Sequence, residues 1–311
     1  MKLNDIISFG PVTIDYIGTA NKLNNNESAT LLQQLVHSYG GRGANFCVFS
    51  CILGTQPLLI APVGQDYEVS DHQRHLRSFG VNDSGLLVAS GLTPRAFVFS
   101  DESESRTYFF EDTSDQHLMD FAVWTESVVA STPHELIYCT SGIQHLNQLC
   151  LELSKADLKA YAPGHEIMYH SVESLNTCFK STDVLLVNEH EAQVFEQRAM
   201  KSIESAANEF DIEIVVITLG SQGSLLITNG QQIHIAPCRP KVEVDSTGAG
   251  DAFAAGFLTT FLRLKDPLLA AQFGNAVASF AVESLGCQSS LPTKERILER
   301  VSSNYGFSPD I

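Results

Sequence analysis

Basic residues are scarce in this chain of 311 residues, where 19 Lys and Arg stand against 36 Asp and Glu and the formal net charge is −17. Without a basic block, a protein does not neutralise the phosphates of nucleic acid or bind an acidic membrane surface, so we expect neither partner. No apolar run is long enough to span a bilayer. Residues 1–5 lead straight into a predicted strand without the apolar region of a signal peptide, so we expect a cytoplasmic protein.

Three further signals are missing, and each excludes a class of protein. The seven cysteines are scattered from Cys47 to Cys287 without paired spacing, which argues against structural zinc and a disulfide scaffold. The dipeptide Gly-Lys does not occur, which excludes a P-loop kinase. Phe9-Gly10-Pro11-Val12 stands after the first predicted strand, where a nicotinamide oxidoreductase would carry Gly-x-Gly-x-x-Gly.

Short apolar runs alternate with helical patterns along the chain, which is typical of a parallel sheet covered by helices on both faces. The runs are 6–9, 58–61, 136–139, 184–187 and 214–217, and helices are predicted over 45–53, 171–179 and 189–197. Two segments break this rhythm. Apolar residues at 95–100 and 106–110 flank a polar stretch and predict a β-hairpin, while residues from about 11 to 40 are too polar for a buried parallel core.

The most informative segment is 245–257, where a turn of small residues and a carboxylate precede an apolar helix. Gly248, Ala249 and Gly250 let successive N–H groups point one way, and the helix adds roughly half a positive charge at its N-terminus. Asp251 falls in the first helical turn, where a carboxylate either performs chemistry or only favours the helix dipole. Because a mere cap does not need three small residues before it, the segment predicts a phosphoryl-transfer site.

A second glycine-rich stretch, Gly-Gly-Arg-Gly-Ala-Asn at 40–45, also opens an apolar helix. With these two motifs the chain resembles the ribokinase-like (PfkB) family of carbohydrate and nucleoside kinases, and fragments at 9–15, 62–66, 187–192 and 218–223 follow in the family's order. The resemblance covers nearly the whole chain. It implies one kinase domain over 1–311, a three-layer α/β/α fold with a mostly parallel central sheet, and a small β-rich lid formed by about 11–40 and 92–112.

The resemblance implies that the γ-phosphoryl group of ATP is transferred to a hydroxyl, which requires a positioned acceptor, a base and charge stabilisation. Asp251 would be the base, and the amides of Gly248, Ala249 and Gly250 would form an anion hole. The remaining roles are carried over by position: Asp15, Gly41, Gly43 and Asn45 would bind the acceptor, and Asn188, Thr218, Gly220, Gly223 and Asn275 would bind the nucleotide.

Two ion sites are also implied. Asn188 and Glu191 match the family's N-x-x-E motif, which organises magnesium (Mg2+) through its water shell; read from the residues alone, 188–191 is an ordinary capped helix start. Asp245 and Thr247 match positions where some relatives hold a monovalent cation such as potassium (K+). Arg42 could steer a phosphate, although an exposed loop arginine is the favoured interpretation.

The acceptor stays open at the level of sequence. Fragments at 78–85, 93–97, 161–165 and 304–307 resemble the bacterial adenosine kinase branch, whereas the intact motif at 40–45 is similar to ribokinase itself. The acceptor is therefore an adenosine-like nucleoside or, alternatively, a free sugar of the ribokinase or fructokinase type. A non-catalytic nucleoside- or nucleotide-binding module is the alternative from another class, and the intact Asp251 argues against it.

Aromatic residues alternate along the predicted hairpin at Phe97, Phe99, Tyr108 and Phe110. Such a face is more apolar than a solvated hairpin should expose, so we expect it to pack on the core, the substrate or a partner subunit. Members of the family often form homodimers through their lids, so a moving lid and a fixed dimer contact both remain open.

Overall fold

A nine-stranded sheet forms the centre of the computed structural model, which describes residues 5–23, 29–101, 105–110 and 115–307. All pairings from β11 to β5 are parallel, whereas β12 and β13 are antiparallel at one edge. In spatial order the strands are β13 (Gln231–Ile235), β12 (Ser224–Thr228), β11 (Ile214–Thr218), β10 (Val184–Asn188), β9 (Leu158–Tyr161), β8 (Leu136–Cys139), β1 (Ile6–Phe9), β4 (Leu58–Val63) and β5 (Asn82–Val88).

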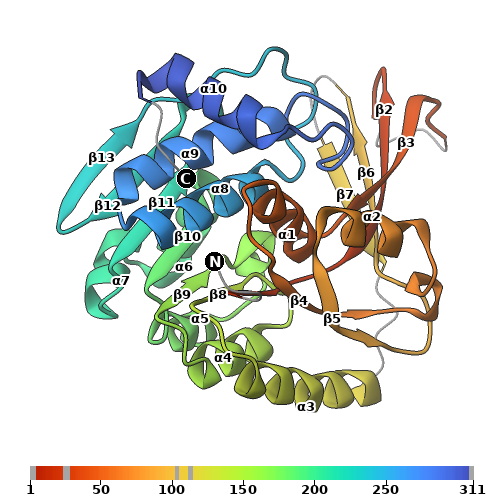
Figure 1. Ribbon diagram of the computed structural model, residues 1–311, viewed down its shortest axis with the longest axis horizontal. Coiled ribbons are helices and arrows are strands. Elements are labelled where there is room, and N and C mark those ends of the chain that lie inside the picture. Colours follow the sequence, from red (N-terminus) through yellow and green to blue (C-terminus); the bar gives the residue numbers. More distant parts are fainter. Residues whose placement is uncertain (1–4, 24–28, 102–104, 111–114, 308–311) are drawn as a thin grey trace.

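Helices cover both faces of this sheet, so the predicted three-layer architecture is confirmed (Figure 1). One face packs against α1 (Arg42–Ile52), α2 (Asp71–Phe79), α8 (Ala249–Leu264), α9 (Pro267–Ala281) and α10 (Lys294–Tyr305). The other face packs against α3 (Asp115–Ser131), α4 (Gln144–Leu153), α5 (Val172–Phe179), α6 (Glu189–Ala199) and α7 (Ile203–Glu209). Three 3₁₀ turns complete the fold: η1 (Gln65–Tyr67), η2 (Gly164–Met168) and η3 (Gly220–Gln222).

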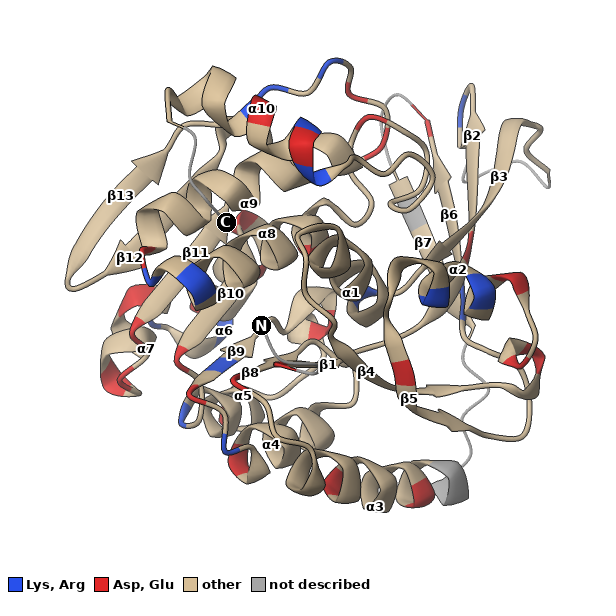
Figure 2. Ribbon diagram, in the orientation of Figure 1, with Lys and Arg blue, Asp and Glu red and all other residues tan. Residues whose placement is uncertain are grey.

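Charge follows this layering. Acidic residues mark the outer helices α3, α7 and α10 in Figure 2, whereas α8 is buried along most of its length. Apolar runs such as that of β8, whose four residues are all buried, are compatible only with a strand that has helices on both faces. No helix among the described residues has the length and apolarity needed to cross a membrane.

The lid is a separate four-stranded sheet in the order β3 (Leu32–Gly40), β2 (Thr13–Ala20), β6 (Arg95–Ser100) and β7 (Ser105–Phe110). It confirms the predicted hairpin and lies beside α1 and α2 (Figure 1). The predicted lid segments also include 24–28, 102–104 and 111–112, which fall outside the described residues.

The two faces of the lid have different surroundings. Register pairs Ala96 with Phe109 and Val98 with Thr107 on the face that lines a cavity of the main body. Phe97 pairs with Tyr108 on the opposite face, where Tyr108 is 54% exposed. Because side chains alternate along a strand, Phe97, Phe99, Tyr108 and Phe110 share the face of the lid opposite to the one that lines the cavity.

The strand order reverses at β1, which pairs with β4 on one side and with β8 on the other. In open α/β sheets, ligands bind outside the carboxyl ends of the strands at such a switch point. Helix α1 approaches this point closely because Gly43 has no side chain: a Cβ there would lie 2.4 Å from the carbonyl oxygen of Gly10. The fold therefore brings the first glycine-rich motif to the end of β1.

Candidate active site

The N-terminus of α8 carries the proposed base. Gly248 precedes the helix with φ 76°, and a Cβ there would lie 2.3 Å from Cys287 Sγ, so glycine is required on both counts. Asp251 lies in the first turn, is 7% exposed, and its Oδ2 accepts a hydrogen bond of 2.8 Å from Asn45 Nδ2. Burial raises the pKa of Asp251 to about 6, although Asn45 and the Arg42 cation oppose the rise.

A second buried carboxylate belongs to the lid. Asp15 on β2 is 5% exposed, and its Oδ1 accepts a hydrogen bond of 2.6 Å from Thr13 Oγ1. Burial raises the pKa of Asp15 to about 6, and the nearby carboxylates of Asp251 and Asp245 add to the rise. Both carboxylates face a cavity of about 470 Å³, which Gly41, Asn45, Thr247 and Gly248 also line. The structure thus brings together most of the predicted acceptor residues.

Gly43 has a different place. It is buried against Gly10, it accepts a hydrogen bond of 3.3 Å at its carbonyl from Ser8 Oγ, and it is not among the described residues that line the cavity. Its absent side chain serves the close packing of α1 on β1.

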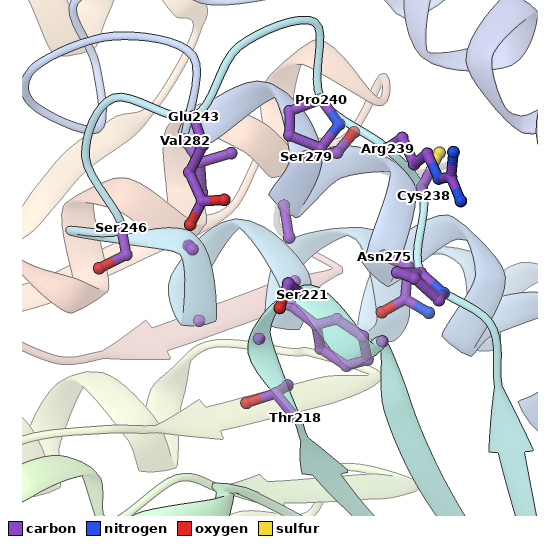
Figure 3. Close-up of a pocket in the computed structure, with 17 residues that line it drawn as sticks. Thr218, Ser221, Cys238, Arg239, Pro240, Glu243, Ser246, Asn275, Ser279 and Val282 are labelled. Atoms are coloured by element: carbon purple, nitrogen blue, oxygen red, sulfur yellow. The ribbon is translucent and has the colours of Figure 1, made fainter.

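A second cavity, of about 390 Å³, contains the predicted nucleotide residues Thr218, Gly220, Gly223 and Asn275. Asn275 and Ser246 lie on opposite walls of it in Figure 3. Asn275 has a structural partner, because its Nδ2 donates a hydrogen bond of 3.2 Å to the carbonyl oxygen of Ala236. Sequence reasoning did not anticipate the lining residues Pro237, Cys238, Arg239, Pro240, Glu243, Phe253, Ser279 and Val282.

We name the first cavity the acceptor cavity and the second the nucleotide cavity, after the residues predicted for each. The two meet at the start of α8, since Gly248 and Asp251 line the acceptor cavity while Ala249 and Gly250 line the nucleotide cavity. The Ala249 amide is already used, because it donates a hydrogen bond of 3.1 Å to the carbonyl oxygen of Ser246. A Cβ at Gly250 would meet no atom within 4 Å, so this position opens on free space. Of the three predicted anion-hole positions, Gly250 is the one most open to an anion.

Asn188 and Glu191 form a reciprocal capping box at the start of α6. Glu191 Oε2 accepts a hydrogen bond of 3.0 Å from the Asn188 amide, and Asn188 Oδ1 accepts one of 2.8 Å from the Glu191 amide. Burial raises the pKa of Glu191. The pair also lines a small cavity of about 90 Å³ together with Gly250 and Asp251, so the capped helix start lies at the junction of the site. Within the described ranges, no three His, Cys, Asp or Glu side chains are grouped to hold a metal directly.

Asp245 stabilises the turn before α8 through two hydrogen bonds. Its Oδ1 accepts a hydrogen bond of 2.9 Å from the Thr247 amide, and its Oδ2 accepts one of 2.9 Å from the Gly286 amide.

The favoured interpretation of Arg42 as an exposed loop residue is wrong. Arg42 is the first residue of α1, and its side chain is 17% exposed. Its Nη2 donates a hydrogen bond of 2.7 Å to Glu166 Oε1, and its Nη1 donates one of 3.2 Å to the carbonyl oxygen of Pro163. Arg42 lines both the acceptor cavity and the small junction cavity, so a cation stands where the two sites meet.

An aromatic stack that the sequence did not reveal forms part of the lining of the acceptor cavity. Phe109 of the lid and His165 of η2 stack with ring centroids 4.9 Å apart and an interplanar angle of 3°. Side chains alternate between the two faces of the hairpin, so the sequence would have placed Phe109 on the cavity face only if the strand register had been known.

The chain is similar to known proteins along nearly its whole length. The profile of the pfkB family carbohydrate kinases matches residues 3–294. The chain is 28% identical over 307 residues to a nucleoside kinase of Methanocaldococcus jannaschii, covering 97% of this chain and 98% of that protein. It is 28% identical over 274 residues to a ribokinase of Haemophilus influenzae, covering 84% and 87%.

Solved structures show the same fold. A crystal structure of the M. jannaschii nucleoside kinase superimposes with a TM-score of 0.85 at 27% identity and covers 97% of this chain and all of that chain. A nucleoside kinase of Burkholderia thailandensis in complex with inosine superimposes with a TM-score of 0.88 at 19% identity, covering 98% of this chain and all of the other. The chain belongs to the pfkB family of carbohydrate kinases, enzymes that transfer a phosphoryl group to a hydroxyl.

Proposed function

We propose that this protein phosphorylates a hydroxyl of a nucleoside with ATP. The observation that carries the proposal is the acceptor cavity of about 470 Å³, whose lining combines the buried carboxylates of Asp15 and Asp251 with the stack of Phe109 and His165. The carboxylate end suits a sugar, because Asp15 can accept hydrogen bonds from neighbouring hydroxyls. The aromatic end suits a nucleobase, since a flat ring gains by stacking on Phe109. A free pentose would leave that end unfilled.

In the proposed reaction, Asp251 accepts the proton of the hydroxyl that attacks the γ-phosphorus. A carboxylate whose pKa is about 6 is ionised near neutral pH and still basic enough to take that proton. The open Gly250 position and the N-terminus of α8 would stabilise the phosphoryl oxygens from one side. Arg42, held in place by Glu166, would add positive charge from the other side of the junction.

The nucleotide cavity fits ATP. Its volume of about 390 Å³ lies within the range of roughly 300–1,000 Å³ that is typical of small-molecule sites. Phe253 and Val282 offer apolar surface to a base, and Gly250 leads to the acceptor side. Thr218, Gly220, Gly223 and Asn275 remain our candidates for nucleotide contacts.

Magnesium would neutralise charge on the phosphates, and Glu191 is the residue of this chain best placed to hold it. One oxygen of Glu191 is used by the Asn188 amide, which leaves the other to accept a hydrogen bond from a metal-bound water. Since Mg2+ usually keeps several waters in proteins, a single nearby carboxylate suffices.

A monovalent cation near Thr247 is a further part of the proposal. Asp245 and Gly286 already tie the turn before α8 to the segment that follows α9, and a bound cation would stiffen the same turn. We expect faster turnover in potassium chloride than in the chloride of a bulky organic cation; equal rates in potassium, sodium and the organic cation would remove the idea.

Two other functions remain distinguishable by experiment. The similarity to ribokinase favours a free-sugar kinase, and a non-catalytic nucleoside sensor would keep the same cavities. Consumption of ATP should be measured with adenosine, inosine, cytidine, ribose and fructose, each against a blank without acceptor. A nucleoside should give the highest kcat/KM. Preference for ribose or fructose would establish the sugar kinase, and nucleoside binding without ATP consumption would establish the sensor.

A further inference from the structure

A chain of hydrogen bonds connects the second layer of the site to the proposed base. His75 Nε2 lies 2.8 Å from Gln288 Oε1, and Gln288 Nε2 donates a hydrogen bond of 2.8 Å to Asn45 Oδ1. Asn45 Nδ2 in turn donates a hydrogen bond of 2.8 Å to Asp251 Oδ2. The four side chains come from α2, the segment after α9, α1 and α8, so only the folded chain aligns them.

The chemistry of the groups determines the direction of this chain. An ionised Asp251 only accepts, so Asn45 must turn its NH₂ group toward it and its oxygen toward Gln288. Gln288 then donates through Nε2 and presents Oε1 to His75, whose Nε2 must carry a hydrogen. Every donor in the chain therefore points toward Asp251, and such donation favours the ionised carboxylate.

The surroundings hold the chain in this arrangement. Asn45 and Gln288 are 3% and 6% exposed, so an amide turned the wrong way would leave buried polar atoms unpaired. The segment that carries Gln288 is tied to the turn before α8, because the Gly286 amide bonds Asp245 and Cys287 Sγ donates to the Gly248 carbonyl at 3.5 Å. The ring of His75 contacts Tyr39 and Phe79, with centroids 4.8 Å and 5.1 Å away.

We propose that Gln288 and His75 are positioning residues that act through Asn45 to keep Asp251 ionised and aimed at the acceptor hydroxyl. The proposal rests on the role of Asp251 as the base. Neither Gln288 nor His75 is among the described residues that line the acceptor cavity, whereas Asn45 is. Two positions far from the reacting atoms thereby influence the proton transfer.

Other groups act on the two ends of the chain. Burial and the Glu166 carboxylate disfavour the ionised form of Asp251, and the Arg42 cation favours it. Asp15 shares the cavity with Asp251 and repels its charge. At the other end, burial disfavours the charged form of His75 while Gln288 favours it, and His72 lies close on the same helix. Because burial and the carboxylates both oppose ionisation of Asp251, the donation from Asn45 is needed to offset them.

The direct test is a pH titration of the Asp251 side-chain carboxyl carbon by NMR, assigned by its loss in Asp251→Asn. Gln288→Met keeps the length of the side chain and removes both hydrogen bonds. His75→Phe keeps the ring contacts and removes the donor. Each should raise the titration midpoint by about half to one pH unit, because Asn45 loses the support that aims its NH₂ group and its hydrogen bond to the charged form weakens. This readout needs no acceptor, so it is independent of which substrate the enzyme takes.

His72→Phe is the matched control. His72 also lies on α2 and stacks on Tyr39. Neither of its buried ring nitrogens has a hydrogen-bond partner among the described residues. It should leave the titration of Asp251 unchanged. A shift as large as that of His75→Phe would mean that general packing of α2, not the hydrogen-bond chain, sets the titration.

Kinetics provide a second readout. Gln288→Met should lower kcat about fivefold to tenfold, move the acidic limb of the kcat profile to higher pH, and leave the KM for ATP unchanged. The double variant Gln288→Met/His75→Phe should be no slower than Gln288→Met alone, because both changes interrupt the same series of hydrogen bonds. Additive losses, or an unchanged Asp251 midpoint in folded His75→Phe, overturn the proposal. Full activity in Asp251→Asn would instead refute the proposed base. The NMR titration of Asp251 would still show whether the hydrogen-bond chain affects its ionisation.

Discussion

At the scale of single residues, the site is built around two carboxylates that the fold keeps out of water. Asp15 and Asp251 both face the acceptor cavity, and burial raises the pKa of each to about 6. Charges placed there repel each other and lose hydration, so the folded protein spends stability on keeping them. Such a cost is expected at a functional site and would give Asp251 the basicity that the proposed proton transfer needs.

The exchange of Asp251 for asparagine tests the role of the base. An amide has the size of the carboxylate but cannot take the proton of the acceptor, so Asp251→Asn should lower kcat by about 100-fold to 10,000-fold. The Kd for ATP should stay within a few fold, since Asp251 lies on the acceptor side. Isothermal titration and steady-state rates measure the two quantities. Retention of more than about a tenth of kcat would show that another group is the base.

The raised pKa values also predict how stability depends on pH. A carboxyl group whose folded pKa lies above the unfolded value of 3.8 makes the native state less stable as the pH rises from about 4 to about 6. Asp15→Asn and Asp251→Asn should therefore each raise the free energy of unfolding at pH 8 by about 2 to 3 kcal/mol, and the Tm with it. The gain should vanish near pH 4. A Tm that falls at pH 8 would show instead that the carboxylates stabilise the fold, for example as helix caps.

At the scale of elements, the lid contributes to the site through the face that carries Asp15, Ala96 and Phe109. Strand β2 provides the carboxylate end of the cavity, and β7 provides its aromatic end. The contact between Phe109 and His165 joins the lid to η2 of the main body. Residues of the lid therefore line the cavity in which we propose that the acceptor binds.

Replacing Phe109 tests the assignment of the aromatic end. Phe109→Ala should raise the KM for the nucleoside about tenfold, because a stacked base contributes roughly 1 to 3 kcal/mol. The KM for ATP should not change, since Phe109 does not line the nucleotide cavity in the described chain. Phe109→Tyr keeps a flat ring and should behave like the wild type. If the alanine variant left the nucleoside KM unchanged, the base would have to bind elsewhere.

At the scale of the whole molecule, the outer face of the lid packs on α2 at Tyr39 but is exposed over much of the rest in the described chain. Leu35, Tyr108 and Phe110 are 60%, 54% and 44% exposed, and register places them with Tyr16 and Phe97 on the side away from the cavity. Clustered apolar side chains on one surface are typical of an interaction site. The arrangement favours the homodimer contact over packing of this face on the substrate.

Dilution distinguishes a dimer from a moving lid. If the outer face forms a dimer contact, amide hydrogen exchange across residues 95–100 and 105–110 should be slow in the free protein and should accelerate on dilution. Tyr108→Glu should give a monomer by sedimentation, because a charge in an apolar contact is costly. Protection that rises only on addition of the acceptor, with an unchanged sedimentation coefficient, would show that the lid moves and that no dimer forms.

Local features of this protein could be read from its sequence. The buried strands β1, β4, β8, β10 and β11 were predicted because continuous apolar stretches between helical patterns are typical of strands covered on both faces. The turn before α8 was predicted because Gly248 and Asp251 lie within a few residues of each other, and only short-range geometry is involved. Helix α1 begins at Arg42 and not at Asn45, since Gly41 is its N-cap.

Long-range contacts were decided only by the tertiary structure. Arg42 meets Glu166 across 124 residues and Asn45 meets Gln288 across 243, and no local pattern encodes such pairs. The face of the lid that lines the cavity depends on strand register, where a shift of one residue exchanges the two faces. The basicity of Asp251 also depends on burial that forms when α1, α8 and β2 pack together. Sequence therefore determined which groups could do chemistry, and packing determined where they stand and how they ionise.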